Sequence, residues 1–316
     1  MEKHLLVAGA AGFIGFHTTL ALIKNGYSVT AVDNLDATLY SAEEKVCRFD
    51  ILGKIPEVKC INADINDSKL GEQLTEVSAV INCAAIPGLL TSWTTADRYF
   101  FSNTLGPFHL IRSVSEKSSN FKFIHLSTSS VYGDSATTDE EGAVNPSSPY
   151  GISKHAGEQL LMLEANNLGI DGKILRLFSV YGSHQRPDMG IRIFMDAMLN
   201  GKEFGLTAAG EHKRSFTHVF DVVNAILSCL NYSGNEHVFN IGGSETVSIL
   251  ELIETIEQVT GKPAKYFHLA DRLGDQITTS ANFSRAQQSL SYRPTVSLMD
   301  GIKEQYEWQQ QLNNKS

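Results

Sequence analysis

The sequence predicts an α/β protein with a doubly wound parallel sheet and a smaller α/β domain toward the C-terminus. Three observations lead to this prediction. Short apolar segments alternate with amphipathic ones through the first half of the chain, which is typical of a parallel sheet covered by helices on both faces. A glycine-rich segment follows the first apolar one. Beyond residue 178 the alternation gives way to turn-rich sequence.

The first unit of this alternation lies at the N-terminus. Residues 5–8 are apolar and predict a strand, residues 13–25 have the spacing of an amphipathic helix, and residues 28–32 predict a second strand. The other strands predicted for the sheet are also short and mostly apolar, and they lie at residues 58–62, 79–83, 121–126 and 172–178.

Helical patterns connect the later strands. Two of them cover residues 97–117 and 150–168. In the C-terminal part, residues 248–260 predict a further helix, which Gly261 and Pro263 end.

A domain boundary is expected after residue 178. Residues 1–178 are predicted to form the first domain and residues 179–316 most of the second. Because residues 238–243 (VFNIGG) have the composition of one more apolar strand, a segment near residues 215–243 is expected to return to the first domain.

Composition excludes several classes of protein. The 316 residues are 42% hydrophobic and 19% charged, as in ordinary globular proteins. A net charge of −9 disfavours nucleic acid as a partner. No uncharged apolar run reaches the roughly 20 residues that a membrane span needs. We therefore expect neither nucleic acid nor a membrane as a partner.

The cysteines and histidines show no metal-ligand spacing. The four cysteines form no CxxC pair, and the ten histidines form neither HxH nor HExxH. We therefore expect no metal site and no disulfide framework. The first residues also lack the features of a secretory signal, so a cytoplasmic location is expected.

A glycine-rich loop joins the first predicted strand to the first helix. Residues 9–15 read GAAGFIG. Gly9 and Gly12 allow the backbone to turn and approach a pyrophosphate, whose charge the helix N-terminus meets, while Gly15 allows the helix to pack close to the sheet. The loop predicts a dinucleotide site.

Asp33 ends the second strand, about 20 residues beyond that loop. A carboxylate at this position binds both hydroxyls of an adenosine ribose and repels a 2′-phosphate, and no arginine follows nearby to accept one. NAD is therefore predicted rather than NADP. The alternative is that Asp33 only caps the end of its strand.

Tyr150 and Lys154 lie four residues apart, on one face of a predicted helix. A neighbouring cation stabilises a phenolate and lowers its pKa from about 10, which makes Tyr150 a candidate general base. The YxxxK pattern also arises by chance in exposed helices. Here it follows a strand end rich in hydroxyl residues, STSSVYG at 127–133, which can orient a substrate oxygen.

Four motifs together resemble the extended short-chain dehydrogenase/reductase family, specifically its nucleotide-sugar epimerases and dehydratases. They are the loop at 9–15, the strand end at 127–133, YxxxK, and RLFSVYG at 176–182. The resemblance runs to about Trp308 and implies a Rossmann fold for the first domain.

The resemblance also implies roles for individual residues. Thr128 matches the catalytic Ser/Thr, Tyr150 the base and Lys154 its ribose-binding partner. Cofactor contacts are expected from Gly9, Gly12, Phe13, Ile14, Gly15, Asp33, Asn34, Asp64, Ile65, Ala84, Ala85, Tyr150, Lys154 and, beside the nicotinamide, Phe178. Substrate contacts are expected from Ser129, Ser130, Ser179, Arg186, Arg214, Arg272 and Asp275.

Ser129 and Ser130 favour one branch of this family. Dehydratases of the family usually carry an Asp-Glu pair there, and decarboxylating members usually carry Glu at the position of Ser130. Without an added acid or base, reversible oxidation at C4 is the minimal chemistry. Tyr150 would take the 4-hydroxyl proton as hydride passes to NAD, and hydride would return to the other face of a 4-keto sugar.

Shorter matches resemble UDP-glucuronate 4-epimerases. These matches are GFIGFH at 12–17, DNL at 33–35, TSS at 128–130 and QRPDM at 185–189. Leu90 and Thr207 depart from the usual family residues, which leaves the sugar and the nucleotide base open.

The predicted function is an NAD-dependent UDP-sugar 4-epimerase that converts UDP-glucuronate to UDP-galacturonate. By analogy with similar proteins, it is expected to be a homodimer that pairs through helices 97–117 and 150–168. The alternatives are a nucleotide-sugar 4,6-dehydratase, a 4-ketoreductase and a non-catalytic NAD-binding protein.

Overall fold

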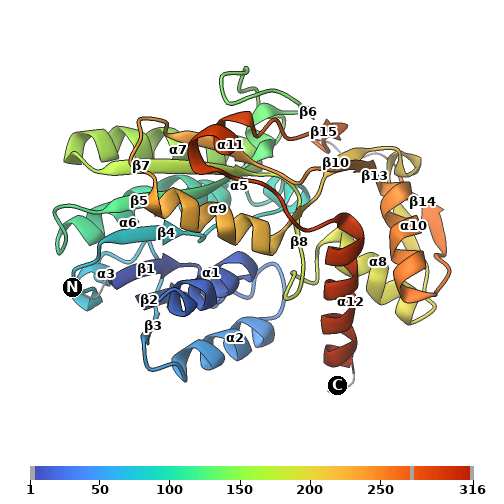
Figure 1. Cartoon of the computed structure of the whole chain (residues 1–316), viewed down its shortest axis with the longest axis horizontal. Coiled ribbons are helices and arrows are strands. Elements are labelled where there is room, and N and C mark those ends of the chain that lie inside the picture. The colour runs from blue at the N-terminus through green and yellow to red at the C-terminus, as the bar shows by residue number, and fades with distance from the viewer. Residues whose placement is uncertain (1–3, 271–273, 314–316) are drawn as a thin grey trace.

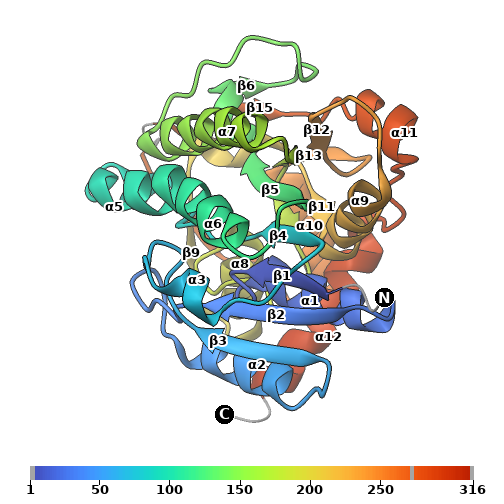
Figure 2. The same cartoon turned by 90° about the vertical axis from the view of Figure 1, so that its left-hand side faces the viewer.

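The computed structural model describes residues 4–270 and 274–313. A large parallel sheet lies between two layers of helices, and a smaller group of helices and short strands stands beside it (Figure 1). The helices that cover one face of the sheet are seen most clearly after a quarter turn (Figure 2).

The central sheet has seven strands, all paired in parallel, in the order β12-β7-β5-β4-β1-β2-β3. The strands are β1 (His4–Ala8), β2 (Ser28–Asp33), β3 (Val58–Asn62), β4 (Ala79–Asn82), β5 (Lys122–Thr128), β7 (Asp171–Leu177) and β12 (Val238–Ile241). The direction of the strand order reverses between β1 and β4, where such sheets open a crevice at their carboxyl ends. The predicted doubly wound parallel sheet is confirmed.

Strand β1 shows why these segments are apolar throughout. Leu5 and Val7 belong to one buried cluster, and Leu6 and Ala8 belong to another on the opposite face. Successive side chains of a strand alternate between the faces, so helices on both sides bury Leu5 through Ala8.

Each face of the sheet has its own layer of helices. The cluster around Leu5 includes side chains from α1 (Phe13–Lys24), α2 (Glu43–Gly53) and α9 (Val219–Asn231). The cluster around Leu6 includes side chains from α3 (Leu70–Gln73), α6 (Gly106–Ser115) and α7 (Pro149–Leu168).

Helix α7 has clear start and stop signals. The Ser148 hydroxyl accepts a hydrogen bond of 3.1 Å from the Gly151 amide, and Pro149 occupies the first helical position. Gly169 ends the helix with a φ of +69°. These signals place Tyr150 in the first turn.

The helix predicted at 97–117 is interrupted. Helix α5 (Ala96–Phe100) runs into a π-helical turn, η1 (Phe101–Leu105), before α6 begins. Pro107 has no amide hydrogen for a regular helical bond, which favours such a break. The carbonyl oxygen of Asn103 lies so close to α7 that a Cβ on Gly157 would come within 2.2 Å of it.

A third buried cluster fills the C-terminal part of the chain. It joins α8 (Gly190–Leu199), α10 (Ile249–Thr260) and α12 (Leu298–Asn313). The α10 helix begins with a capping box formed by Ser248 and Glu251 and ends at Gly261, as predicted.

Short strands and helices complete the fold. A four-stranded sheet has the order β13-β10-β15-β6, and two pairs are formed by β11 with β8 and β14 with β9. These strands are β6 (Ser135–Ala136), β8 (Val180–Tyr181), β9 (Phe204–Leu206), β10 (Lys213–Ser215), β11 (Thr217–His218), β13 (Thr246–Ser248), β14 (Tyr266–His268) and β15 (Thr278–Thr279). The remaining helices are α4 (Leu89–Ser92), η2 (Ser129–Tyr132), η3 (Ala208–Gly210) and α11 (Ser284–Leu290).

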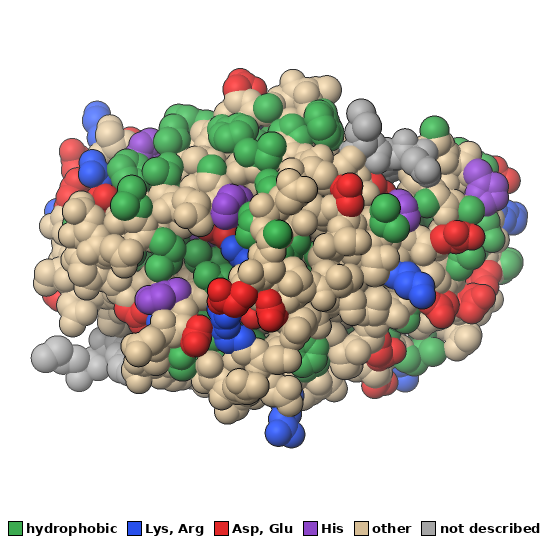
Figure 3. Space-filling view, turned by 90° about the horizontal axis from the view of Figure 1, so that it is seen from above, with side chains coloured by type: hydrophobic (Ala, Val, Ile, Leu, Met, Phe, Trp, Pro, Cys, Tyr) green, Lys and Arg blue, Asp and Glu red, His purple; other side chains and the backbone are tan. Residues whose placement is uncertain are grey.

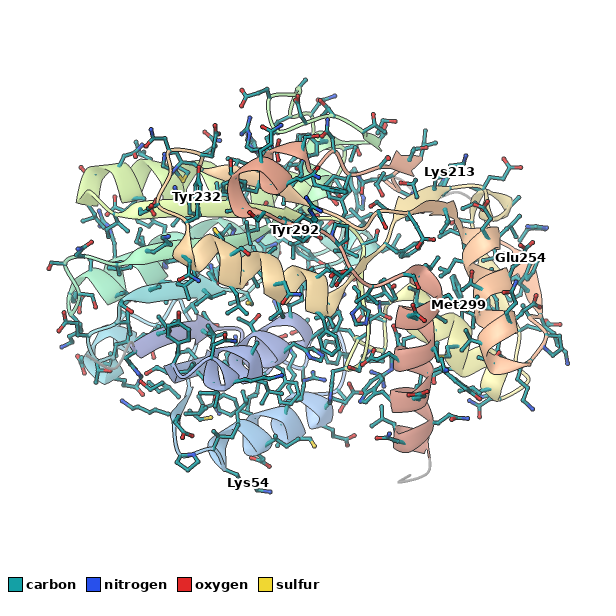
Figure 4. All side chains as sticks on the ribbon, viewed as in Figure 1. Lys54, Lys213, Tyr232, Glu254, Tyr292 and Met299 are labelled. Atoms are coloured by element: carbon teal, nitrogen blue, oxygen red, sulfur yellow. The ribbon has the colours of Figure 1, made fainter. Side chains whose placement is uncertain are left out.

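The chain crosses back to the large sheet after α9. Strand β12 pairs with β7, with Val238 opposite Ile174. Tyr292, labelled in Figure 4, then donates a hydrogen bond of 2.9 Å to the Gly242 carbonyl, which holds the segment after α11 against the end of β12.

Candidate active site

A cavity of about 1210 Å³ lies at the carboxyl ends of the central strands. Its volume exceeds the range of about 300–1,000 Å³ that is usual for one small ligand, so it has room for a dinucleotide and a second molecule. Its wall combines residues that follow β1, β2, β4 and β5 with residues from the C-terminal part of the chain.

The cavity wall contains almost all of the predicted site residues. They are Gly9, Gly12, Phe13, Ile14, Gly15, Asp33, Asn34, Asp64, Ile65, Ala84, Ala85, Thr128, Ser129, Ser130, Tyr150, Lys154, Ser179, Arg186, Arg214 and Asp275. Phe178 is not part of the wall, because its ring is fully buried beside Val131 and Tyr132. Its expected position beside the nicotinamide stays a prediction. Arg272 lies outside the described residues.

The glycine-rich loop is held against the ends of two strands. The Gly9 and Ala10 amides both donate to the Val32 carbonyl, at 2.8 and 3.2 Å. Gly9 has a φ of +74°, and a Cβ there would lie 2.7 Å from the Ala84 nitrogen. Only glycine fits this position. The loop thus leads the backbone into the N-terminus of α1, where amides can meet a pyrophosphate.

Asp33, at the end of β2, stabilises the same loop through hydrogen bonds. Its carboxylate accepts hydrogen bonds of 2.9 Å from the Ala11 and Leu35 amides. Burial raises the pKa of Asp33 above its ordinary value, and these amide bonds and the charge of Lys45 oppose the rise. The remaining acceptor sites of the carboxylate are available to ribose hydroxyls.

Asn34 and Asp64 form the neighbouring part of the wall. The Asn34 side-chain amide donates to the Asp64 carboxylate at 2.8 Å, across two strand ends. Asp64 also accepts from the Asn66 amide at 2.8 Å. Asn34, Asp64 and Asn66 therefore form one hydrogen-bonded group on the cavity wall.

Two cations that the sequence did not predict also lie on the cavity wall, beside Asp36. Lys45, on α2, donates to the Asp36 carbonyl at 2.5 Å and lies 4.8 Å from the centre of the Tyr40 ring. Arg98, on α5, pairs with the Asp36 carboxylate at 3.0 Å. Chain spacing gives no signal for these contacts, because α2 and α5 reach the cavity from different layers.

The hydroxyl residues after β5 form a tight turn. The Ser130 amide donates to the Thr128 hydroxyl at 3.1 Å, and the two hydroxyls lie 3.2 Å apart. Gln276 supports the turn from the C-terminal part by donating to the Ser129 and Gly133 carbonyls, at 3.3 and 2.8 Å. Sequence reasoning missed Gln276.

Tyr150 faces the cavity from the first turn of α7. Burial raises the pKa of Tyr150 above its ordinary value, while the Thr128 hydroxyl and the charge of Arg186 act to lower it. The expectation that Lys154 lowers the Tyr150 pKa does not hold in this structure. The reason is geometric, because the Lys154 nitrogen donates instead to the Leu126 carbonyl at 2.6 Å.

Two arginines expected to meet phosphate have acidic partners. Arg186 makes a two-bond contact with Asp188, at 2.9 and 2.8 Å. Arg214 donates to Asp275 at 2.9 Å, so the structure brings together two residues 61 positions apart that are both expected to contact the substrate. A diphosphate would compete with both carboxylates for these guanidinium groups.

Within residues 4–270 and 274–313, no cluster of three or more His, Cys, Asp or Glu side chains is arranged to hold a metal ion. In the same part of the chain, no helix has both the length and the apolar character needed to cross a membrane.

Comparison with known proteins gives consistent matches. The model of the NAD dependent epimerase/dehydratase family matches residues 5–242. A Bacillus subtilis protein described as an uncharacterized UDP-glucose epimerase is 33% identical over 308 residues, which cover 94% of this chain and 95% of that protein. The UDP-glucuronate 4-epimerase of Thermodesulfobacterium geofontis is 32% identical over 310 residues, which cover 96% of this chain and 95% of that enzyme.

A solved structure agrees over nearly the whole chain. The UDP-glucuronic acid 4-epimerase from Bacillus cereus, in complex with UDP-glucuronic acid and NAD, superimposes with a TM-score of 0.91. It is 36% identical in sequence, and the match covers 98% of this chain and 100% of that one.

Proposed function

Because the chain belongs to the NAD-dependent epimerase/dehydratase family, we propose that it is a UDP-sugar 4-epimerase that interconverts UDP-glucuronate and UDP-galacturonate. One observation carries this proposal. Thr128, Tyr150 and Lys154 line the same cavity as the glycine-rich loop, and the two residues after Thr128 are serines rather than acids.

NAD is the cofactor of this family, and the residues present fit it. The loop beginning at Gly9 and the Asp33 carboxylate provide a pyrophosphate cradle and a ribose acceptor at one end of the cavity. Ala84 and Ala85 line the same cavity as Tyr150. When bound, NAD supplies the hydride acceptor and donor for chemistry at the sugar C4.

Tyr150 is assigned as the group that removes and returns the proton of the sugar 4-hydroxyl. Its raised pKa favours the neutral phenol in the structure described here, so formation of the base requires additional positive charge near the ring. Lys154 is the nearest candidate on the same helix. Thr128 is assigned to orient the reacting oxygen, because its hydroxyl lies beside Tyr150 at the end of β5.

Serine hydroxyls support a sugar that carries a carboxylate. Ser129, Ser130 and Ser179 line the cavity, and each can donate one hydrogen bond to an anion. An acid at position 129 or 130 would repel that anion. The same serines leave the site without the added acid and base that elimination of water requires.

The two parts of the chain are assigned separate tasks. Residues 1–178, with the segment that returns through β12, are proposed to bind NAD, and residues 179–316 are proposed to supply most contacts to the UDP-sugar. The location of Arg214 and Asp275 on the cavity wall supports the second assignment.

A homodimer is proposed through the outer face of η1 and α7. Ile152 and Leu163 are 45% and 68% exposed on one side of α7, and Phe101 on η1 is 52% exposed. Figure 2 shows α5, α6 and α7 side by side on one flank, and Figure 3 shows hydrophobic side chains at the surface of the molecule. Exposed large apolar side chains on neighbouring helices are typical of an interface between subunits. Light scattering of the wild type and Leu163→Glu tests it.

A cytoplasmic location is also proposed. All four cysteines, Cys47, Cys60, Cys83 and Cys229, are free thiols in the structure, which fits a reducing compartment. Cell fractionation tests this location.

The activity is tested by incubating the purified protein with UDP-glucuronate, with and without added NAD, and following the sugar by proton NMR. UDP-galacturonate without net NADH is expected. If only UDP-glucose or an N-acetylated sugar turns over, the proposed substrate is wrong but the chemistry stands. A 4-keto product or net NADH formation would contradict the epimerase.

A further inference from the structure

His125 contacts the side-chain nitrogen of Lys154 and has no role in the proposed reaction. It is fully buried on β5. Its Nε2 atom lies 3.1 Å from Lys154 Nζ, and its Nδ1 atom lies 3.1 Å from the side-chain nitrogen of Asn82. Both ring nitrogens therefore face nitrogen atoms, which restricts where hydrogens can be placed.

A backbone amide determines which partner donates in the hydrogen bond between Asn82 and His125. The Ala84 amide lies 3.1 Å from Asn82 Oδ1, and a backbone amide can only donate. The oxygen of Asn82 must therefore face Ala84, and its NH₂ group must face His125. It follows that His125 Nδ1 accepts and carries no hydrogen.

The remaining hydrogen of a neutral imidazole must then be on Nε2. That hydrogen points at Lys154 Nζ, which can accept it only with a free lone pair. An ammonium has none. The contact is therefore consistent with a neutral Lys154 amine, which accepts from His125 and donates to the Leu126 carbonyl at 2.6 Å.

The other protonation states conflict with these contacts. A doubly protonated His125 would direct one N–H at the Asn82 NH₂ group and the other at Lys154. A neutral His125 with hydrogen on Nδ1 would accept from a Lys154 ammonium, but two donors would then oppose each other between His125 and Asn82. Each conflict leaves a buried donor without an acceptor, which costs about 1–3 kcal/mol.

We propose that Asn82 and His125 are positioning residues that hold Lys154 as a neutral amine before the cofactor binds, and that cofactor binding is coupled to uptake of one proton by Lys154. The proton comes from the solvent and bonds to the Nζ lone pair. The Lys154–His125 hydrogen bond is lost at the same time, because an ammonium cannot accept it.

The surrounding charges set the pH range in which this state is populated. Burial lowers the pKa of Lys154 to about 8, so the neutral amine predominates above about pH 8, and the Glu158 carboxylate on the same helix acts to raise this pKa. Glu158 is itself paired with Arg176 on β7 at 2.8 Å. Burial raises the pKa of the Cys83 thiol to about 12, so this neighbour after β4 is uncharged near neutral pH. Burial and the nearby Lys154 place the pKa of His125 well below its ordinary value.

The inference rests on the proposed function only for the role of Lys154 in binding NAD. The hydrogen-bond chain itself belongs to the protein without cofactor. The experiments below can therefore contradict the hydrogen-bond chain while the epimerase activity is confirmed. They can equally support the chain if the epimerase activity is absent.

The first experiment measures the tautomer of His125 at pH 9, above the Lys154 pKa of about 8, in the full-length, nucleotide-free protein labelled with ¹⁵N-histidine. Long-range proton–nitrogen correlations are expected to show hydrogen on Nε2 and none on Nδ1. The His125 signals are assigned by their absence in His125→Gln. Hydrogen on Nδ1, or on both nitrogens, would overturn the proposal, and the second experiment tests the wild type without any variant.

The second experiment measures proton uptake when NAD binds, by calorimetry in buffers with different ionisation enthalpies. With a Lys154 pKa of about 8, uptake of about half a proton per site is expected at pH 8, rising toward one at pH 9. No uptake in the wild type would contradict the coupling.

Asn82→Asp is the decisive variant, because it keeps the shape but removes the donor. A carboxylate can accept from both Ala84 and His125, so the hydrogen of His125 is expected to move to Nδ1. Nε2 then becomes an acceptor for a Lys154 ammonium, and proton uptake is expected to fall at least threefold. His237→Gln, whose ring bonds to Gly172 far along β7, serves as the control and should retain full uptake. Equal uptake in Asn82→Asp and the wild type would overturn the proposal.

Discussion

The Arg176 guanidinium meets the Glu158 carboxylate through hydrogen bonds of 3.0 and 2.8 Å, one turn beyond Lys154 on α7. Both side chains are almost completely buried. The Tyr132 hydroxyl adds a contact of 2.9 Å to the same guanidinium. This pair fixes the helix that carries Tyr150 and Lys154 to strand β7 of the sheet.

Replacing Glu158 is expected to destabilise the protein strongly. Glu158→Gln leaves the Arg176 charge buried without its anion, and breaking a buried pair in this way costs about 3–5 kcal/mol. The free energy of unfolding from urea denaturation measures the loss. Glu164→Gln is the control, since its partner Arg112 is 58% exposed and the loss should stay below about 1 kcal/mol. If both variants lose the same free energy of unfolding, the buried pair contributes no more to stability than the exposed pair.

Tyr150→Phe is expected to lower turnover by at least about 10²-fold, because the phenol exchanges a proton with the sugar 4-hydroxyl. Binding of NAD should change little, since Asp33 and the glycine-rich loop are untouched. Turnover is followed by proton NMR and NAD binding by calorimetry. Wild-type turnover in Tyr150→Phe would remove this residue from the mechanism.

The strands were predictable because a strand that is buried on both faces has a continuous run of apolar residues. Leu5, Leu6, Val7 and Ala8 are all buried, so β1 appears as a continuous apolar run. Helix ends were also visible where the local chemistry is strong, as at Gly261 after α10.

Helix α12 illustrates why other elements were missed. Gln305 and Gln309 are fully buried, although their side chains are polar. Gln305 accepts from the Gly182 amide at 2.9 Å and donates to the Gln185 side chain at 2.8 Å. A helix that buries glutamines against a loop has little apolar periodicity, so hydrophobic spacing does not reveal it.

The candidate site was predictable where a short continuous segment of the chain determines the positions of its residues. The glycine-rich loop and Asp33 are such cases, since strand, turn and helix follow one another directly. The contact between Lys154 and Leu126 depends instead on how α7 packs over β5, 28 residues earlier. Spacing on the helix alone therefore gave the wrong direction for the Tyr150 pKa.

Asp33→Ala is expected to weaken NAD binding about 10- to 100-fold, because hydrogen bonds to a charged group contribute roughly 1.5–3 kcal/mol. NADP should lose less than about tenfold, since its 2′-phosphate cannot use both carboxylate bonds. Titration calorimetry with each dinucleotide measures the two losses. Asp50→Ala, at an exposed position of α2, should affect neither. Equal losses for both dinucleotides would refute the assigned preference for NAD.

Lys154 is expected to make stability depend on pH in a defined direction. Its pKa is about 8 in the folded protein against an ordinary value of 10.5, so between these values the unfolded chain binds more protons. The free energy of unfolding therefore rises with pH between these two values. At a pH below the folded-state pKa, the protein bears the full free-energy penalty for burying the Lys154 charge. The difference in pKa corresponds to about 3 kcal/mol.

Two substitutions of Lys154 separate this charge effect from packing. Lys154→Met removes the charge, so its free energy of unfolding relative to the wild type should fall by up to about 3 kcal/mol between pH 7 and pH 10. Lys154→Arg stays charged throughout, and its deficit relative to the wild type should grow over the same range. Urea denaturation at both pH values measures these differences. If the free energies of unfolding of both variants change with pH as that of the wild type does, Lys154 is not the group that becomes neutral in the folded protein.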